Sequence, residues 1–173
     1  MKKKSRDWGK TMQKMILEAA PISRSGNIAL YPTLAMNNIG RLGIAWYEYG
    51  SPHEPDRSDV WLSLQDAGGA WAEPVNVSGG VSYNNGPSLI WAHRGGNWCC
   101  AWHSWRPPGK EPFIVDGDVT NIWFCVVSSD GVVQSPLQAL PGVSNTDYAS
   151  LAGVPGEGLQ LLYHDRLQHL QCL

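Results

Sequence analysis

Short apolar segments separated by polar turns follow one another along the chain, and one arrangement of them occurs three times. Its last copy has an alternating segment at 148–152, the turn P-G-E-G, and a second apolar segment at 159–163. This pattern is typical of two β-strands joined by a tight turn. The anchor leucines of the copies, Leu34, Leu89 and Leu151, lie 55 and 62 residues apart. We therefore predict an internal repeat of about 60 residues built from short strands.

The aromatic residues that end the second strand of each copy keep a similar spacing. Trp46, Trp102 and Tyr163 lie 56 and 61 residues apart. A repeat of this length is long for a solenoid and suits a β-propeller blade with insertions. We name the strands of each blade A to D and predict them at 32–36, 41–47, 60–65 and 71–77 in blade one, at 87–91, 97–102, 121–128 and 132–140 in blade two, and at 148–152, 158–163 and 167–173 in blade three, which lacks strand D.

These strands predict a single all-β domain over residues 1–173 that corresponds to half a propeller. Its parts are a turn with a strand D at 5–22, blade one at 31–77, blade two at 87–140 and a partial blade three at 148–173. The segment 11–20 is ambiguous, because Met12, Met15, Ile16 and Ala19 are spaced as on one face of a helix. The repeat register favours a strand, and tertiary pairing often overrides local propensity. We expect a strand, with a helix as the alternative.

The composition supports an all-β chain with many turns. It includes 19 glycines, 12 prolines and 9 tryptophans, and with 43% hydrophobic residues the chain can bury a core. The formal net charge of −2 gives no general attraction to nucleic acid or to anionic membranes. The lysines at 2–4 are not followed by an apolar run, which argues against a secretory signal and a transmembrane span. We expect a cytoplasmic protein.

The four cysteines, Cys99, Cys100, Cys125 and Cys172, do not have the spacing of a metal site. We predict that they are buried, reduced thiols on strands. The alternative is a cross-strand disulfide from Cys125 to Cys99 or Cys100. We expect neither a metal nor a cofactor.

Three segments carry serine, aspartate and glycine in a turn, spaced 59 and 64 residues apart at the aspartates and in phase with the leucine repeat. Aspartate and serine side chains bond to turn backbone, and glycine adopts a φ that other residues avoid. The segments resemble the Asp box of the sialidase (neuraminidase) superfamily, S-x-D-x-G-x-T-W. The resemblance implies sialidase-like propeller blades of four antiparallel strands, with these turns on the face away from the ligand. The residues assigned to them are Ser5, Asp7 and Gly9, then Asp66, Gly68 and Trp71, then Ser128 and Asp130.

The opposite face of such a propeller carries the B–C loops and the D–A connections, where charged and aromatic residues gather in this chain. Long loops on a rigid frame are common ligand sites, and Trp105 could cover the apolar side of a sugar ring. The alternative is that these loops are polar only because they are exposed. We predict that the face binds a glycan or another small ligand without catalysis, through His53, Glu54, Arg57, His103, Trp105, Arg106, Asp147, His164, Asp165 and Arg166.

Tyr148 begins the segment Y-A-S-L, which is followed by G-L-Q-L-L-Y. Together they resemble the sialidase segment that bears the nucleophilic tyrosine. The resemblance implies Tyr148 as the catalytic nucleophile of a glycosidase, which is the alternative function. His164 stands where that family has glutamate, and no arginine stands in the register of its R-I-P motif. Whether the chain is an enzyme stays open, and a third alternative is an assembly or scaffold protein.

Three blades cannot close a ring, and soluble proteins avoid long unpaired strand edges. The chain begins at an Asp-box turn that leads into a strand D, and it ends on a strand C. We therefore expect a homodimer in which strands are exchanged between blades. Two chains joined head to tail would close a six-bladed ring around a two-fold axis.

Overall fold

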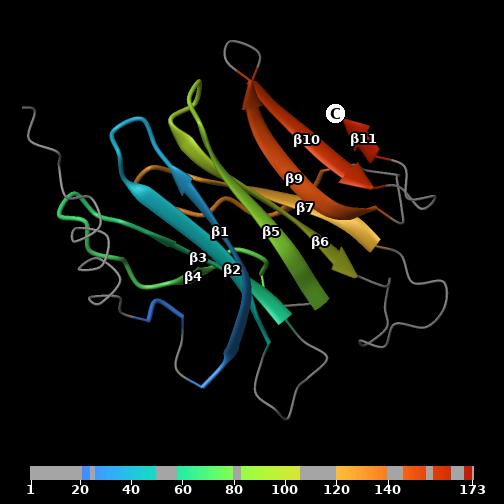
Figure 1. Cartoon of the computed structure of the whole chain (residues 1–173), viewed down its shortest axis with the longest axis horizontal. Helices are drawn as coiled ribbons and strands as arrows, with labels where there is room; N and C mark the ends of the chain where they lie inside the picture. Colours follow the sequence, from blue (N-terminus) through green and yellow to red (C-terminus); the bar gives the residue numbers. More distant parts are fainter. Residues whose placement is uncertain are drawn as a thin grey trace, which may run out of the picture.

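The computed structural model describes residues 21–23, 26–49, 58–79, 83–105, 120–139, 146–154, 158–164 and 170–172. Over these residues the chain contains strands and turns and no helix, which confirms the prediction of an all-β fold for this part (Figure 1). The segment 11–20, for which a strand and a helix were both considered, lies outside the described residues. None of the described segments is a helix long and apolar enough to cross a membrane.

The strands form three units in which consecutive strands pair antiparallel. Their positions follow the repeat that the hydrophobic pattern predicts. The units are β1 (Ile28–Met36), β2 (Leu42–Tyr49), β3 (Ser58–Leu64) and β4 (Val75–Asn76); β5 (Tyr83–Ala92), β6 (Asn97–Trp105), β7 (Thr120–Val127) and β8 (Leu137–Gln138); and β9 (Asp147–Val154), β10 (Gly158–His164) and β11 (Leu170–Cys172).

The fourth strands, β4 and β8, are much shorter than the predicted segments 71–77 and 132–140. Each begins directly after a proline, Pro74 or Pro136. Proline has no N–H to donate to a strand ladder, so pairing is interrupted there. Before the prolines, only the isolated bridges at Trp71 and Val133 continue the ladder.

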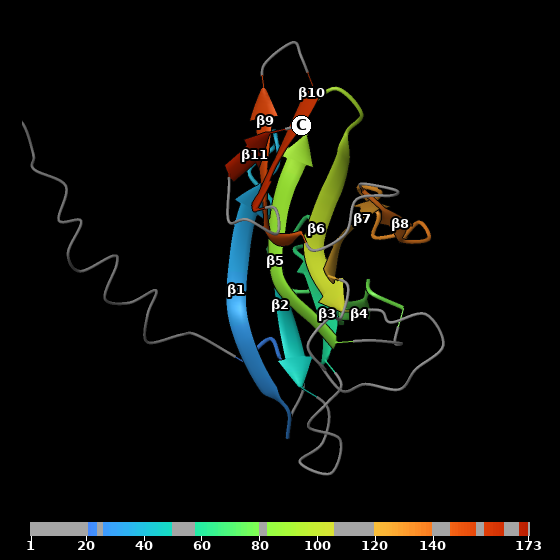
Figure 2. The same cartoon turned by 90° about the vertical axis from the view of Figure 1, so that its right-hand side faces the viewer.

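A single parallel bridge between Ser58 and Tyr83 joins β3 to β5, so that the first two units form one eight-stranded sheet. The third unit is a separate three-stranded sheet. The first strands of the three units, β1, β5 and β9, lie side by side, with β5 in the middle (Figures 1 and 2). One end of the molecule therefore gathers the starts of these three strands.

The core lies between the units, as expected for sheets that pack face to face. Tyr47 and Leu62 of the first unit belong to the same buried cluster as Leu89 and Trp102 of the second. A second cluster joins the second unit to the third and contains Ala101, Ile122, Ala149 and Leu161. Neighbouring residues on β6 thus face different units, because side chains alternate along a strand.

A buried polar network connects the first two units. The Asn84 Nδ2 atom donates to the Ser58 carbonyl oxygen at 2.8 Å, and the Asn84 backbone N–H donates to Ser58 Oγ at 2.9 Å. Trp102 Nε1 donates to Asn84 Oδ1 at 3.0 Å. Asn84 and Ser58 are fully buried. The single parallel bridge is therefore reinforced by side-chain hydrogen bonds that are shielded from water.

All four cysteines are free. Cys100 lies directly opposite Cys125 on the neighbouring strand, and both are buried in the first core cluster. Burial raises the pKa of Cys99 to about 11 and that of Cys125 to about 12, so these thiols stay protonated at neutral pH. The prediction of buried, reduced thiols is correct for these three residues. It is wrong for Cys172, which is exposed on β11.

Candidate ligand-binding site

The first strand of each unit contains a β-bulge at the same position of the repeat. In every case two residues of β1, β5 or β9 stand opposite one residue of the neighbouring strand. The first residue of each bulge has a positive φ: +49° at Tyr31, +56° at Gly86 and +55° at Tyr148. The residues opposite the bulges are the repeat-ending aromatics Trp46, Trp102 and Tyr163. The repeat thus includes a backbone feature as well as a pattern of apolar residues.

Tyr31 and Tyr148 adopt this conformation at an energetic cost. Glycine enters the left-handed region freely, whereas a bulky residue there is strained by about 1–3 kcal/mol. Bulges redirect a side chain, and here they direct two aromatic side chains into solvent. Tyr31 is 68% exposed and Tyr148 is 69% exposed. Their strain is therefore not offset by burial of the rings.

The Tyr148 ring contacts two imidazoles. The centroids of His103 and His164 each lie 5.6 Å from that of Tyr148. His103 is buried at the end of β6, and His164 is the last residue of β10. All three were predicted from the sequence as site residues, and the structure brings them together. We call them the imidazole patch.

The Tyr31 ring belongs to a continuous group of tyrosines on the first two units. It stacks on Tyr47 with centroids 5.7 Å apart, and Tyr47 meets Tyr49 edge-on at 5.4 Å. The Tyr49 and Tyr83 hydroxyls share a hydrogen bond of 2.8 Å. Burial first, and then the tyrosine neighbours, raise the pKa of Tyr47 well above its ordinary value, so its phenol stays neutral. We call these four residues the tyrosine patch.

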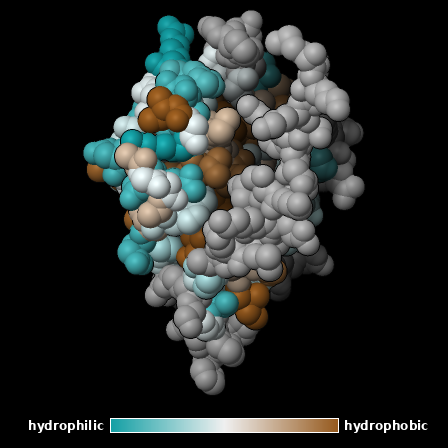
Figure 3. All heavy atoms as spheres, turned by 60° about the vertical axis from the view of Figure 1, so that its left-hand side comes forward, coloured by the Kyte–Doolittle hydropathy of each residue, from teal (hydrophilic) through white to brown (hydrophobic). Residues whose placement is uncertain are grey.

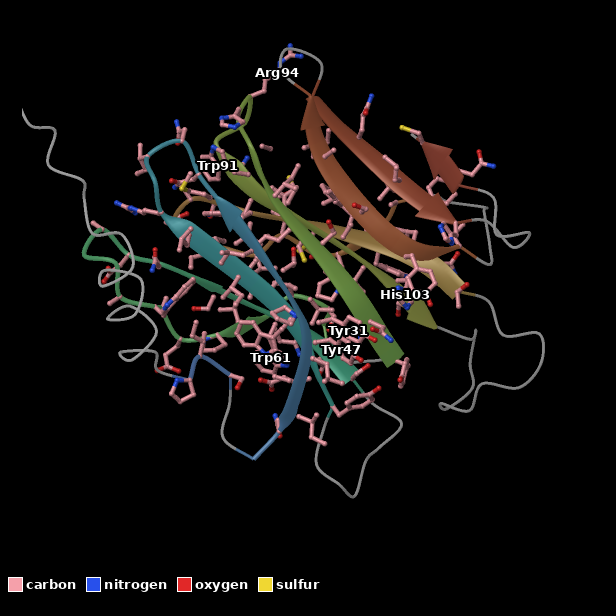
Figure 4. All side chains as sticks on the ribbon, in the orientation of Figure 1. Tyr31, Tyr47, Trp61, Trp91, Arg94 and His103 are labelled. Atoms are coloured by element: carbon pink, nitrogen blue, oxygen red, sulfur yellow. The ribbon has the colours of Figure 1, made fainter. Side chains whose placement is uncertain are left out.

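Both patches lie at the end of the molecule where β1, β5 and β9 begin. Figure 4 shows Tyr31 and Tyr47 together on β1 and β2 and His103 on β6 in the same region, with Arg94 at the opposite end. The residues of the tyrosine patch were not among the predicted site residues. The sequence did point to Tyr31, because Tyr31 occupies the same repeat position as the predicted site residue Tyr148.

Gly86, on the strand between the two patches, has no side chain at the equivalent position. A Cβ atom there would lie 3.1 Å from Cε1 and 3.2 Å from Nδ1 of His103. Its φ of +56° also disfavours any other residue. Gly86 is half-buried, and the His103 ring occupies the space in which a side chain at this position would lie.

Several predicted residues lie outside the described part of the chain. Trp105 and Asp147 belong to β6 and β9, but the structure describes only their backbone. The ligand-binding roles of all these residues stay predictions. The residues outside the described ranges are His53, Glu54, Arg57, Arg106, Asp165 and Arg166, together with Ser5, Asp7 and Gly9 of the first turn.

The turns after β3 and β7 lie away from the two patches, because β3 runs from Ser58, paired with Tyr49, to the far end of the sheet. Asp66 Oδ1 accepts hydrogen bonds from the backbone N–H of Gly68 at 2.8 Å and of Ala70 at 2.9 Å. In the second turn Ser128 Oγ donates to Asp130 and accepts from the Val132 N–H. Trp71, which the Asp-box resemblance includes in the first of these turns, is only half-buried.

No family model matches this chain, and no curated protein matches it. Solved structures do match. A protein of unknown function from Dyadobacter fermentans has a TM-score of 0.54 at 19% identity, covering 86% of this chain and 50% of that one. Penicillium chrysogenum α-L-arabinanase, complexed with arabinobiose, has a TM-score of 0.52 at 12% identity, covering 89% and 44%.

An N-acetylgalactosamine deacetylase from F. plautii, in complex with blood group B trisaccharide, has a TM-score of 0.49 at 17% identity, covering 83% and 45%. The chain spans about half the length of the structures it matches. At these sequence identities, the similarity to the matched structures concerns the fold alone. The arabinanase has a propeller-type fold, whereas the described strands of this chain do not close into a ring. The more specific assignment to the sialidase superfamily stays a prediction.

The described residues contain no group of three or more histidine, cysteine, aspartate or glutamate side chains that could hold a metal ion. The chemistry at this end is that of aromatic faces, phenol hydroxyls and imidazoles, together with the buried carboxylate of Glu48, which accepts hydrogen bonds from Trp46 Nε1 and Asn27 Nδ2. Such groups can cover the apolar face of a ring while they hydrogen bond to its substituents.

Proposed function

We propose that this chain belongs to a sialidase-like β-propeller and binds a carbohydrate, without catalysis, at the end that carries Tyr31 and Tyr148. One observation carries the proposal: two equivalent tyrosines are held in a strained conformation with their rings exposed. Strained residues persist mainly where the surrounding structure over-determines them, and they cluster at functional sites. Because the rings are not buried, core packing does not account for them.

The chemistry of the patches suits a neutral sugar. An exposed aromatic face covers the apolar side of a sugar ring, and nearby polar groups bond to its hydroxyls. Tyr49 carries a phenol hydroxyl in the tyrosine patch, and His164 carries an imidazole in the other. The arabinanase of similar fold was solved with arabinobiose, which agrees with carbohydrate binding by this architecture.

Replacing Tyr31 or Tyr148 by glycine tests the proposal, because the equivalent position of the second unit already holds Gly86. Each change relieves a positive φ, so we expect the melting temperature to stay the same or rise. We expect carbohydrate affinity, measured by calorimetric titration after a glycan-array screen, to fall at least about tenfold. Val132→Ala is the control, since Val132 is exposed in a turn at the other end.

Two results would contradict the proposal. One is that no carbohydrate binds the wild type, and the other is that both glycine variants bind as well as the wild type. A loss of binding that occurs only together with a lower melting temperature would indicate a structural role for the tyrosines instead.

The glycosidase with Tyr148 as nucleophile is a second proposal, supported by the two imidazoles against its ring. A phenol nucleophile needs a nearby base to take its proton. Hydrolysis of fluorogenic glycosides by the wild type but not by Tyr148→Phe would favour this enzymatic function over binding alone. Equal activity of the two proteins, or none, would exclude Tyr148 as a nucleophile.

A further inference from the structure

We propose that an exposed face of the first unit packs on the third unit of a second copy of this chain, and that this contact places Tyr31 beside the second copy's His164. The proposal follows from how the three units pack against one another inside the chain. The docking is independent of any ligand. Its consequence for binding rests on the proposed function.

Each unit has two faces, because side chains alternate along a strand and directly paired residues share a face. We call the leading face the one that carries Leu34, Leu89 or Leu151, and the trailing face the opposite one. At both junctions inside the chain, a leading face lies on the trailing face of the unit before it. Leu89 and Leu62 belong to one buried cluster, and Leu151 and Phe124 are packed against the other.

Part of the leading face of the first unit is exposed. Leu34 is exposed, whereas its equivalent Leu89 is buried. Met36, two residues further along β1 and on the same face, is exposed as well. The rest of this face is covered, since Trp46 and Glu48 are buried. The open part is therefore the apolar end of β1.

The trailing face of the third unit is exposed in a corresponding way. Cys172 on β11 stands opposite Leu162 on β10. The equivalent pair in the first unit is Leu62 and Ala45, and both are buried at the junction with the second unit. Cys172, in contrast, is exposed, and so is Ser150, which stands opposite Leu162 on β9. One face of each kind is thus open at the two ends of the row of units.

A second copy of the chain supplies the surface that each open face matches. A leading face packs on a trailing face twice within the chain, so the proposed contact continues the two interfaces already formed. Exposed apolar patches commonly mark interaction surfaces. A contact between two different faces is heterologous, and it generates either a closed ring or a filament. In a dimer, two such contacts close, and each copy uses both of its open faces.

The repeat also indicates what the contact does at the end that carries the two patches. Tyr31 lies against Tyr47, and Tyr148 lies against His164, which has the same position in its unit as Tyr47. Tyr148 also contacts His103, the residue at this repeat position in the preceding unit. In the proposed contact Tyr31 takes the place of Tyr148. The second copy's His164 takes the place of His103, and the tyrosine patch gains an imidazole.

Thiol cross-linking tests the docking. Cys172 is exposed on one face, and Leu34→Cys adds a thiol to the other. The proteins are treated with a short bis-maleimide and separated on a denaturing gel. We expect Leu34→Cys to form mainly a cross-linked dimer, and Leu34→Cys combined with Cys172→Ser to stay monomeric. Cys99 and Cys125 are buried, and burial raises their pKa to about 11 and about 12, so they do not compete.

Val132→Cys is the matched control, because Val132 is also an exposed apolar residue but lies in the turn after β7. Equal cross-linking of Val132→Cys and Leu34→Cys would mean random collision, and no dimer with Leu34→Cys would exclude the contact. Either result overturns the proposal. A ladder of trimers and larger species would show that the contact repeats without closing, which overturns the dimer.

Nuclear magnetic resonance tests the position of Tyr31. Wild type with isotope-labelled histidine is mixed with an excess of unlabelled Tyr31→Gly, or of unlabelled wild type, and the subunits are allowed to exchange. An aromatic ring shifts the resonances of a neighbouring imidazole, so we expect the His164 signal to move only in the mixture with Tyr31→Gly. His164→Asn assigns this signal. The His93 signal, from the turn after β5, is the internal control and should not move.

The outcomes separate the contact from the proposed function. An unmoved His164 signal together with specific cross-linking would overturn the position of Tyr31 beside His164. Neither measurement uses a carbohydrate. A negative glycan array would therefore contradict the proposed function and leave both results on the contact unchanged.

Discussion

Asn84 shows how much one buried polar side chain contributes to the contact between units. Its amide donates to the Ser58 carbonyl and accepts from the Trp102 indole, and it is fully buried. A hydrogen bond of this kind contributes modestly when made, but an unsatisfied buried partner costs about 1–3 kcal/mol. The identity of this residue therefore matters more to stability than its size suggests.

We expect Asn84→Ala to lower the free energy of unfolding by about 3 kcal/mol, because two buried partners lose their hydrogen bonds. Urea denaturation of the variant and of the wild type measures this difference. Asn38→Ala is the matched control, since Asn38 is exposed in a turn, and its effect should stay within about 0.5 kcal/mol. A loss below about 1 kcal/mol for Asn84→Ala would show that water replaces the amide.

At the scale of the element, the turn after β3 depends on one carboxylate. Asp66 accepts two backbone N–H bonds, and Gly69 in the same turn has a φ of +84°. Ser63 Oγ donates to the Ala72 carbonyl at 2.7 Å and holds the other side of the hairpin. The turn is thus organised by local hydrogen bonds, and the half-buried Trp71 contributes less packing than a core residue.

We expect Asp66→Ala to lower the melting temperature by about 2–4 °C, the usual effect of losing about 1 kcal/mol in a chain of this length. Asp66→Asn keeps a side-chain oxygen in the same place, so its melting temperature should stay near that of the wild type. Thermal unfolding by circular dichroism makes the comparison. Equal losses in both variants would mean that the charge of Asp66, not its acceptor geometry, stabilises the turn.

At the scale of the whole molecule, equivalent residues of the three units have unequal surroundings. Leu89 is 3% exposed because the second unit packs against the first, whereas its equivalent Leu34 is 58% exposed. Met36 and Ile28, on the same strand, are also exposed. Figure 3 shows hydrophobic residues at the surface beside a largely hydrophilic area. The exposed side of β1 therefore corresponds to the side of β5 that is buried between the first two units.

The homodimer stays a prediction, and in it another unit would cover this exposed face of β1. We expect light scattering of the wild type to give about twice the chain mass of 19.0 kDa. Leu34→Asp should shift the protein towards the monomer, because a charge cannot be buried at the interface without a partner. Val132→Asp, at a second exposed apolar residue, should not. A monomeric wild type would exclude self-association through this face.

The strand positions and the repeat were predictable because they depend on local chemistry. Alternating apolar residues, turn glycines and the spacing of Leu34, Leu89 and Leu151 are all present in a linear reading. The short fourth strands also have a local cause in Pro74 and Pro136, although the predicted segments extended through them. The candidate site was predictable in part: Tyr148, His103 and His164 do lie together, whereas Tyr47, Tyr49 and Tyr83 were not assigned to it.

By itself, the sequence determined an all-β chain of three similar units, because hydrophobic period and turn chemistry act over a few residues. Only the tertiary structure decided the partners, the burial and the side-chain direction of equivalent positions in the three units. Strand register set Cys100, and not Cys99, opposite Cys125. Packing of β5 beside β1 buried Leu89 while Leu34 stayed exposed. The bulges turned Tyr31 and Tyr148 outward, because a positive φ arises from how two strands pair and not from the residue that adopts it.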